Sequence, residues 1–160
     1  MIATTKELTD LLERKGIRYE LLPHRHTESA GDEAEALGVD AHEVAKTVVL
    51  RSGRHFVRAV IPACDRLDVH KLRYVLNAPS DPHFAHEEEL AGAYPTFELG
   101  AVPPVGGPVD DRVVVDRRLA DRETIVIEAG SHDESVRLAT TDLLVLSHAA
   151  IGDLCLADAA

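Results

Sequence analysis

Aromatic residues, cysteines and long apolar runs are all scarce in this chain. Only 4% of its 160 residues are aromatic and 45% are hydrophobic, so the core must be built from Leu, Val, Ile and Ala. No stretch reaches the roughly 18 uninterrupted apolar residues that a membrane helix needs. Residues 1–10 include polar and charged residues where a secretory signal would need an apolar run. We therefore expect one cytoplasmic domain over residues 1–160 with no membrane contact.

The cysteine pattern and the missing motifs exclude several kinds of active site. Cys64 and Cys155 form no Cys-x-x-Cys pair, so neither a zinc cage nor a redox motif is supported, and we expect two reduced, largely buried thiols. The sequence also has no Gly-x-Ser-x-Gly elbow, no Walker loop and no dinucleotide fingerprint. If the chain is a hydrolase, water is therefore the expected nucleophile.

The chain has fewer basic than acidic residues, with 17 Lys and Arg against 28 Asp and Glu. The net charge of −11 argues against a protein that grips DNA or RNA over a wide surface, because phosphate contacts need Lys and Arg. Residues 46–73 are the exception, with seven bases and two acids and hence a local balance of +5. This segment is either a solvated charged face or a small phosphate-binding patch.

Apolar periodicity and turn residues predict an alternation of short helices and strands. The predicted helices cover residues 5–15, 29–37, 68–76, 87–91 and 141–148, with a further turn at 40–43. The predicted strands cover residues 17–21, 46–51, 54–61, 112–116, 124–128 and 135–139. Helices and strands mix without strict βαβ order, so we expect an α+β domain around a mixed, mainly antiparallel, partly barrel-like sheet with flanking helices.

Three features could carry chemistry. Lys46 opens a predicted strand, where its ammonium can reach a phosphate or an ester carbonyl. Residues 99–107 form a Gly/Pro loop whose backbone N–H groups could hold an oxyanion or a nucleotide. His132, in a turn, can bind a substrate hydroxyl or move a proton. Each also has an ordinary structural explanation: an edge lysine that discourages aggregation, a surface loop and a turn histidine.

A histidine pair raises the question of a metal. His24 and His26 share one side of an extended segment and could bind a metal ion. No third ligand is evident from the spacing, and nine histidines in the chain make close pairs common by chance. We therefore expect no metal, and a metallohydrolase built on His24 and His26 is the weakest alternative.

The order of these motifs resembles that of the YbaK / prolyl-tRNA editing family across nearly the whole chain. The main stretches that carry the resemblance are His26-Thr27, Val44-Ala-Lys46-Thr47-Val-Val-Leu50, Ala59-Val-Ile-Pro62, Leu67-Asp-Val-His-Lys71-Leu72, Gly100-Ala-Val-Pro-Pro-Val-Gly106, Val113-Val-Val-Asp116 and Glu128-Ala-Gly130-Ser-His132. One departure is Ala101, which replaces the first glycine of the family's Gly-x-x-Pro-x-Gly loop and follows Gly100. Alanine disfavours the positive φ that glycine adopts freely.

The resemblance implies a YbaK-like, synthetase-associated editing domain that hydrolyses the ester between a small noncognate amino acid and tRNA. Alanine and cysteine on tRNA(Pro) are the first candidates. The implied partners are the 3′ end of aminoacyl-tRNA and an aminoacyl-tRNA synthetase, and no cofactor is implied. The resemblance assigns catalysis to Lys46, Gly106 and His132, and substrate binding to His26, Thr27, Thr47, Gly100, Ala101, Pro104, Val105, Gly107 and Ser131. The alternative from another class is a non-catalytic module of the same fold that binds a tRNA end, a nucleotide or a synthetase.

Overall fold

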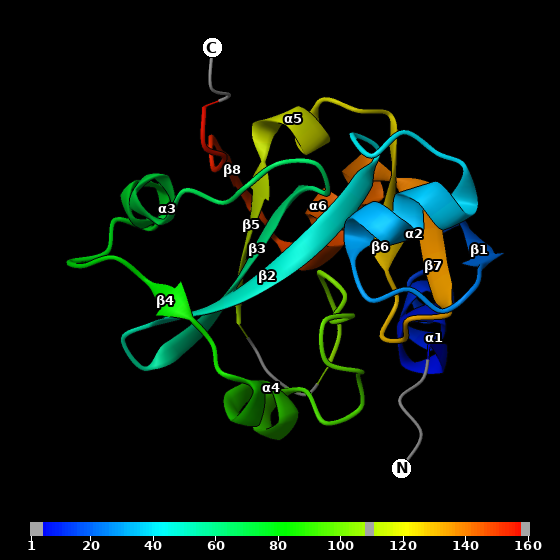
Figure 1. Ribbon diagram of the computed structural model, residues 1–160, viewed down its shortest axis with the longest axis horizontal. Helices are drawn as coiled ribbons and strands as arrows, with labels where there is room; N and C mark the ends of the chain where they lie inside the picture. Colours follow the sequence, from blue (N-terminus) through cyan, green and yellow to red (C-terminus); the bar gives the residue numbers. More distant parts are fainter. Residues whose placement is uncertain (1–4, 108–110, 158–160) are drawn as a thin grey trace.

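The computed structural model describes residues 5–107 and 111–157, which form helices and strands of one α+β domain (Figure 1). The helices are α1 (Lys6–Arg14), α2 (Ala30–Leu37), α3 (Val69–Leu76), α4 (Glu87–Ala93), α5 (Arg117–Ala120) and α6 (Thr140–Ser147). The strands are β1 (Tyr19–Pro23), β2 (Val44–Ser52), β3 (His55–Pro62), β4 (His83–Phe84), β5 (Arg112–Asp116), β6 (Thr124–Glu128), β7 (Glu134–Ala139) and β8 (Ala150–Gly152).

The strands form one mixed sheet in the order β1-β7-β6-β2-β3-β5-β8, with the short β4 added to β2. Four pairings are antiparallel (β1–β7, β6–β7, β2–β3 and β2–β4) and three are parallel (β2–β6, β3–β5 and β5–β8). The predicted mixed, mainly antiparallel sheet is therefore confirmed. The sheet is open rather than closed into a barrel, because β1 and β8 stand at opposite ends of the strand order.

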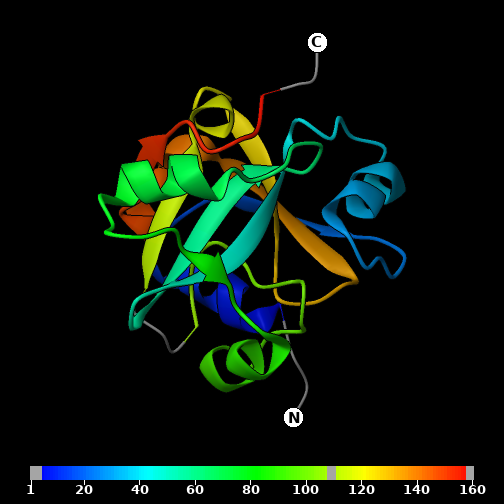
Figure 2. The same cartoon turned by 60° about the vertical axis from the view of Figure 1, so that its left-hand side comes forward.

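Helices and loops cover both faces of this sheet. On one face α1, α5 and α6 bury Leu8, Leu12, Leu119 and Leu143 in a cluster with alternate residues of the strands. On the other face α3 packs over β2, β3 and β5 through Leu72 (Figure 2), while α2 packs over the start of β2 and β6. Because successive strand residues point to opposite faces, each strand contributes to both layers.

Local signals explain why α2 sits where it does. The Ser29 side chain caps its N-terminus by accepting a hydrogen bond from the backbone N–H of Asp32 at 3.1 Å. Gly38 ends the helix in the left-handed conformation, with φ of +68°. Between these caps Ala30 and Ala34 pack against Val44 and Val126, which fixes the helix over the sheet.

Some elements differ from the sequence predictions. Residues 40–43 form a turn rather than a further helical turn, and the short elements β4, α5 and β8 were not predicted. They contain two, four and three residues, too few for a periodic signal, and β4 and β8 exist because strands β2 and β5 pair with them. Cys155 is buried as expected, whereas Cys64 is exposed.

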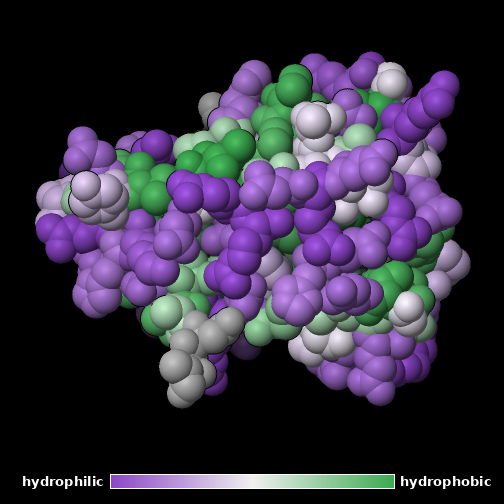
Figure 3. Space-filling model, turned by 90° about the horizontal axis from the view of Figure 1, so that it is seen from above, coloured by the Kyte–Doolittle hydropathy of each residue, from purple (hydrophilic) through white to green (hydrophobic). Residues whose placement is uncertain are grey.

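The described helices include none with the length and apolarity that a membrane crossing requires. Seen from above, hydrophilic residues cover most of the surface and hydrophobic residues form separate patches (Figure 3). The exterior is therefore largely polar on this side of the molecule.

Two carboxyl groups are buried between α2 and the sheet. Glu33 is 4% exposed and accepts a hydrogen bond from the hydroxyl of Ser135, which pairs with Glu128 across β6 and β7. Burial raises the pKa of Glu33 to about 7, although the Ser135 hydrogen bond opposes this rise. Burial also raises the pKa of Glu128, followed in effect by the charge of Glu33. Each group therefore favours its protonated form in the folded protein.

Replacing Glu33→Gln is expected to flatten the pH dependence of stability. A carboxyl whose pKa is raised by folding stabilises the fold while it is protonated, and this contribution is lost as pH rises through the folded pKa. The shift from 4.5 to about 7 corresponds to about 3 kcal/mol lost by the wild type as pH rises from about 5 to about 8. Urea unfolding across this range would measure it.

Glu35→Gln is the matched control, because Glu35 lies on the same helix but is exposed. The control should keep the wild-type slope of unfolding free energy against pH. Equal slopes for Glu33→Gln and the wild type would show that the buried carboxyl does not titrate in this window.

Candidate functional site

Lys46 lies near the start of β2, beside the buried carboxyl pair. Strands β2 and β6 are parallel, with Ala45 opposite Ile127, so the next position places Lys46 next to Glu128. Strand alternation turns Lys46 to the face of Val44, which α2 covers. The charge of Lys46 lowers the pKa of Glu128, although burial and the charge of Glu33 outweigh it.

Both Lys46 and Glu128 have unused polar capacity. Lys46 is partly exposed, and no hydrogen bond or ion pair joins its ammonium to another residue within ranges 5–107 and 111–157. Glu128 is 8% exposed, and its Oε2 atom is buried without a partner among the described residues. An unpartnered buried carboxyl oxygen is costly, and the charge of Lys46 offsets only part of that cost.

His132 connects three segments at the edge of this cluster. One ring nitrogen, Nε2, lies 2.7 Å from the backbone carbonyl of Leu99, so Nε2 carries the hydrogen of this bond. The backbone carbonyl of His132 accepts from the N–H of Thr27 at 3.0 Å, and its ring stands 5.3 Å from that of His26. Since the His132 side chain is only 10% exposed, its orientation is well constrained.

The start of the Gly/Pro loop packs directly on His132. Gly100 has φ of +83°, and a Cβ added there would lie 3.4 Å from Cε1 of His132. Ala101 is buried and is not among the residues with positive φ, and its carbonyl accepts from the N–H of Gly130 at 2.9 Å. Gly100 thus supplies the left-handed conformation, and Ala101 fits the loop without backbone strain.

The rest of the loop continues onto the opposite face of β2. Val102 packs with Val49, and by alternation Thr47 shares that face. Gly106 and Gly107 have φ of +90° and +91°, and added Cβ atoms would meet Leu11 at 3.6 Å and Phe97 at 3.0 Å, respectively.

The structure therefore divides the predicted site residues into two groups. The first surrounds the N-terminal end of α2 and contains Lys46, His26, Thr27, Gly100, Ala101, Ser131 and His132. The second lies with the far part of the loop and contains Thr47, Pro104, Val105, Gly106 and Gly107.

Sequence reasoning missed three residues near these groups. Glu33 and Glu128 form the carboxyl pair, and buried Arg58 bonds to the Gly/Pro loop. For Arg58 and Glu128 a signal was present, because each is a charged residue in a strand that is otherwise apolar and β-branched. Glu33 is harder to detect, since acidic residues are ordinary in the first turn of a helix.

The basic excess of residues 46–73 is largely neutralised by partners from outside this segment. Ion pairs of 2.8 to 3.9 Å join Arg51 to Glu89, Arg58 to Asp111, Lys71 to Asp153 and Arg73 to Asp81. The segment is therefore mainly a paired face rather than a wide phosphate-binding patch, and Lys46 is the base in it that stands beside the carboxyl pair.

Both histidines of the suggested metal pair are engaged by protein groups. Nδ1 of His24 lies 2.7 Å from the carbonyl of Arg25, and its Nε2 lies 2.9 Å from the hydroxyl of Ser135. His26 contacts the carboxylates of Glu28 at 2.6 Å and Asp133 at 3.1 Å, which raise its pKa. Within the described residues no cluster of three or more His, Cys, Asp or Glu could hold a metal ion.

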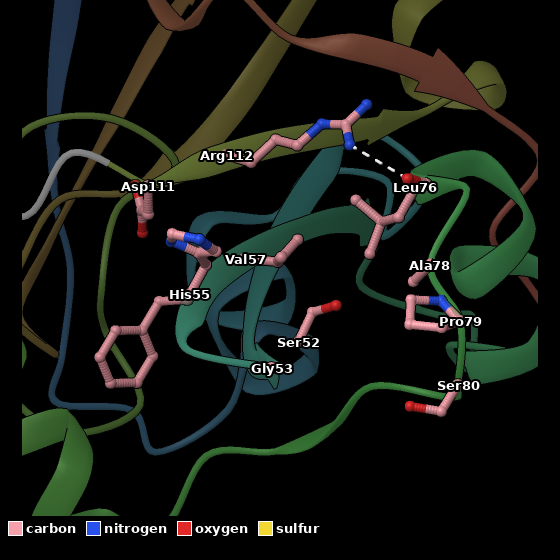
Figure 4. A pocket seen from close by; sticks show the side chains of 11 residues that line it. Ser52, Gly53, His55, Val57, Leu76, Ala78, Pro79, Ser80, Asp111 and Arg112 are labelled. Carbon is pink, nitrogen blue, oxygen red and sulfur yellow. Dashed lines mark hydrogen bonds between the residues drawn. The ribbon is translucent and has the colours of Figure 1, made fainter.

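A hollow of about 590 Å³ lies elsewhere on the surface. It opens between the β2–β3 turn and the end of α3, near Ser52, His55 and Pro79 (Figure 4). Arg112 borders it and donates a hydrogen bond to the carbonyl of Leu76 at 3.3 Å. None of the predicted site residues lines this hollow. Charge and hydrogen bonding, not cavity size, therefore mark the Lys46 region.

Solved structures share this fold. A protein proposed to be a trans-editing enzyme for prolyl tRNA synthetase has a TM-score of 0.83 at 24% identity, covering 96% of this chain and 97% of that chain. The hypothetical protein APE2540 has a TM-score of 0.85 at 23% identity, covering 94% and 99%. A protein from Marinobacter aquaeolei VT8, proposed to act in signal transduction, has a TM-score of 0.71 at 18% identity, covering 94% of this chain and 30% of its own.

The sequence of this chain matches a known family. A search of curated proteins gives no match. The family model described as the aminoacyl-tRNA editing domain matches residues 24–146, which is well over half of the chain and includes Lys46, the Gly/Pro loop and His132. The chain therefore belongs to the aminoacyl-tRNA editing domain family.

Proposed function

We propose that this protein is a hydrolase that cleaves the ester bond between a small noncognate amino acid and tRNA. The observation that carries the proposal is Lys46, an ammonium without a bonded partner among the described residues, next to the buried carboxyl pair of an editing domain. Lys46 would hold the terminal phosphate or the ester carbonyl as a compact point charge.

The reaction needs only modest assistance because an aminoacyl ester is already activated. The oxygen of a water molecule bonds to the ester carbonyl carbon, and the bond to the ribose oxygen then breaks. The water loses a proton, a ribose hydroxyl of the tRNA assists this transfer, and the departing ribose oxygen ends protonated. The amino acid leaves with the new carboxyl group, and the negative charge on the carbonyl oxygen in the intermediate is what the site must stabilise.

His132 would orient the substrate. Its Nε2–H is committed to the carbonyl of Leu99, which leaves Nδ1 without a hydrogen-bond partner among the described residues. That nitrogen would contact the amino group of the substrate or a ribose hydroxyl. Gly100 packs on the ring and adopts a φ of +83°, which favours glycine.

Backbone N–H groups of the loop would stabilise the oxyanion. The N–H groups of Val105, Gly106 and Gly107 donate no hydrogen bond to the described residues, so they are available as donors. These groups belong to the part of the loop that has crossed to the opposite face of β2 from Lys46, so they and Lys46 cannot bind the same carbonyl oxygen. If these N–H groups hold the oxyanion, Lys46 holds the terminal phosphate.

Alanyl- and cysteinyl-tRNA(Pro) are the substrates we propose first. One protein of the same fold is proposed to be a trans-editing enzyme for prolyl tRNA synthetase. A synthetase partner would supply the affinity for tRNA that this acidic protein lacks. An apolar pocket separates amino acids differing by one methylene by only about 1–3 kcal/mol, so serine and threonine esters belong in the same panel.

A non-catalytic binding module is the second candidate. The net charge of −11 favours it, because such a protein gains little affinity for tRNA from its overall electrostatics. Tight binding of aminoacyl-tRNA without turnover on any ester would support the module.

Removing the lysine side chain should abolish most of the activity. Lys46→Ala is expected to lower kcat/KM for the best noncognate ester by about 10²–10³, the usual cost of losing one electrostatic contact in the transition state. The assay is deacylation of tRNA(Pro) charged separately with alanine, cysteine, serine or proline. Lys71→Ala is the matched control, since Lys71 bonds to Asp153 and the carbonyl of Cys155.

Rapid loss of one noncognate ester, with proline spared and Lys46 required, would establish editing. A Lys46→Ala variant that is as fast as the wild type would overturn the assignment of this lysine. Wild-type protein that hydrolyses none of a full panel of aminoacyl-tRNAs would overturn the enzyme proposal itself.

Binding of tRNA should depend only weakly on salt. The net charge is −11, and several basic side chains already form ion pairs with carboxylates of the protein. We therefore expect this protein to contact few phosphates. Each contact with a single strand contributes a slope of about −0.7 to the plot of log affinity against log salt, so we expect a slope of about −1 to −2. Fluorescence anisotropy with labelled tRNA at several salt concentrations measures it, and a slope several times steeper would indicate a wide basic interface instead.

A further inference from the structure

Arg58 is a deeply buried charged residue of the sheet, comparable in burial with Asp116 of β5. It lies in the middle of β3, opposite Val49 of β2, and its side chain is 2% exposed. It shares its face of the sheet with Val60, on the side where the far part of the Gly/Pro loop packs. A buried guanidinium persists only when its donors are satisfied, so its partners indicate its purpose.

The guanidinium bonds to the loop in two places. Nη1 donates to the carbonyl of Pro103 at 2.8 Å, and Nη2 donates to the carbonyl of Gly106 at 2.6 Å. Nε donates to the carboxylate of Asp111 at 2.8 Å. These three bonds leave in different directions from one rigid plane, and a lysine ammonium on a flexible stem cannot reproduce them.

Two further residues hold this guanidinium in place. The hydroxyl of Tyr94 donates to the same Asp111 carboxylate, and the Tyr94 ring lies 4.8 Å from the guanidinium carbon of Arg58. Burial, followed by Asp111, raises the pKa of Tyr94, so its phenol remains a hydrogen-bond donor at neutral pH. Arg58 is therefore locked by a carboxylate and an aromatic ring before it bonds to the loop.

The bond to Gly106 sets the direction of one backbone donor. No cis peptide bond occurs among the described residues, and in a planar trans peptide the C=O and the next N–H point in opposite directions. Because the Gly106 carbonyl faces Arg58, the N–H of Gly107 points away from it. Glycine at both positions would otherwise allow this peptide to rotate easily.

The other end of the loop is fixed independently. Gly130 donates to the carbonyl of Ala101 at 2.9 Å, and the backbone N–H of Glu98 donates to the carbonyl of Gly130 at 2.8 Å. The loop is thus fastened at its start by the turn that carries His132 and at its far end by Arg58. Two adjacent prolines stiffen the span between these points.

We propose that Arg58 is the positioning residue of this editing site, because it holds the far end of the Gly/Pro loop whose start packs on His132. This inference rests on the function proposed above, since the loop matters for rate only if the protein hydrolyses an ester. Arg58 touches neither the substrate nor the reacting atoms and acts through the loop backbone.

The test compares Arg58→Lys with Arg51→Lys in single-turnover deacylation of the best noncognate ester. Arg51 is a matched control on neighbouring β2, because it also forms an ion pair, with Glu89 at 2.8 Å, and lies 5.0 Å from an aromatic ring, that of Phe56. We expect Arg58→Lys to lower kcat about 10- to 100-fold, the scale of a small misplacement in an active site, with KM changed less than about two-fold. Arg51→Lys should leave both constants unchanged.

Hydrogen exchange provides a readout that does not need activity. Amides of residues 101–107 should exchange faster in folded Arg58→Lys than in the wild type and Arg51→Lys. If Arg58→Lys fails to fold, Arg58→Met combined with Asp111→Asn removes both buried charges together and should lower kcat in the same way.

The outcomes separate the two proposals. Unchanged kcat in an active, folded Arg58 variant would overturn the positioning role and leave the enzyme proposal intact. A matching loss in Arg51→Lys would also overturn it, since the effect would then be general to ion-paired arginines of the sheet. If the wild type hydrolyses no ester, the enzyme proposal fails, and the positioning role in hydrolysis fails with it.

Discussion

The parallel pairing of β2 with β6 is the constraint on which the rest of the structure depends. It joins the β1-β7-β6 half of the sheet to the β3-β5-β8 half through two paired positions, Val44 with Val126 and Ala45 with Ile127. A shift of one residue would turn Lys46 to the opposite face and bury apolar side chains against the wrong layer. The packing of α2 on Val44 and Val126 holds this register, so the same contacts that build the core also place Lys46 beside Glu128.

Buried charge is concentrated where these contacts bring the two halves together. Glu128 on β6 and Arg58 on β3 flank β2 at the centre of the sheet and face opposite sides of it, and Glu33 of α2 lies with Glu128. Both cost free energy to bury, and each is compensated differently: the carboxyls by protonation and by Lys46, and Arg58 by Asp111 and by loop carbonyls. Apolar residues at the same positions would cost less free energy to bury. We therefore connect the carboxyl pair and Arg58 to the site and not to stability.

Sequence reasoning located most elements because their signals are local. The Ser52-Gly53 turn predicted the β2–β3 hairpin, and Asp68 predicted the start of α3, where its side chain accepts from the backbone of His70. The open edge of the sheet, β4 and β8 were beyond this reasoning, since they depend on which distant strand is available for pairing. The sequence also did not predict that the two ends of the Gly/Pro loop lie on opposite faces of the sheet. A loop has no periodicity that would assign its residues to a face.

The sequence by itself determined the family, the α+β class and the start of α3 at Asp68, because these depend on local composition and motif order. The roles of Lys46, the Gly/Pro loop and His132 stay predictions. Only the tertiary structure decided that Gly100 and not Ala101 takes the positive φ, and that Glu33 and Glu128 meet beside Lys46. It also decided that most of the basic segment is neutralised by distant acids. The physical reason is that charge pairing and burial depend on residues brought together from remote parts of the chain, and no local pattern specifies those partners.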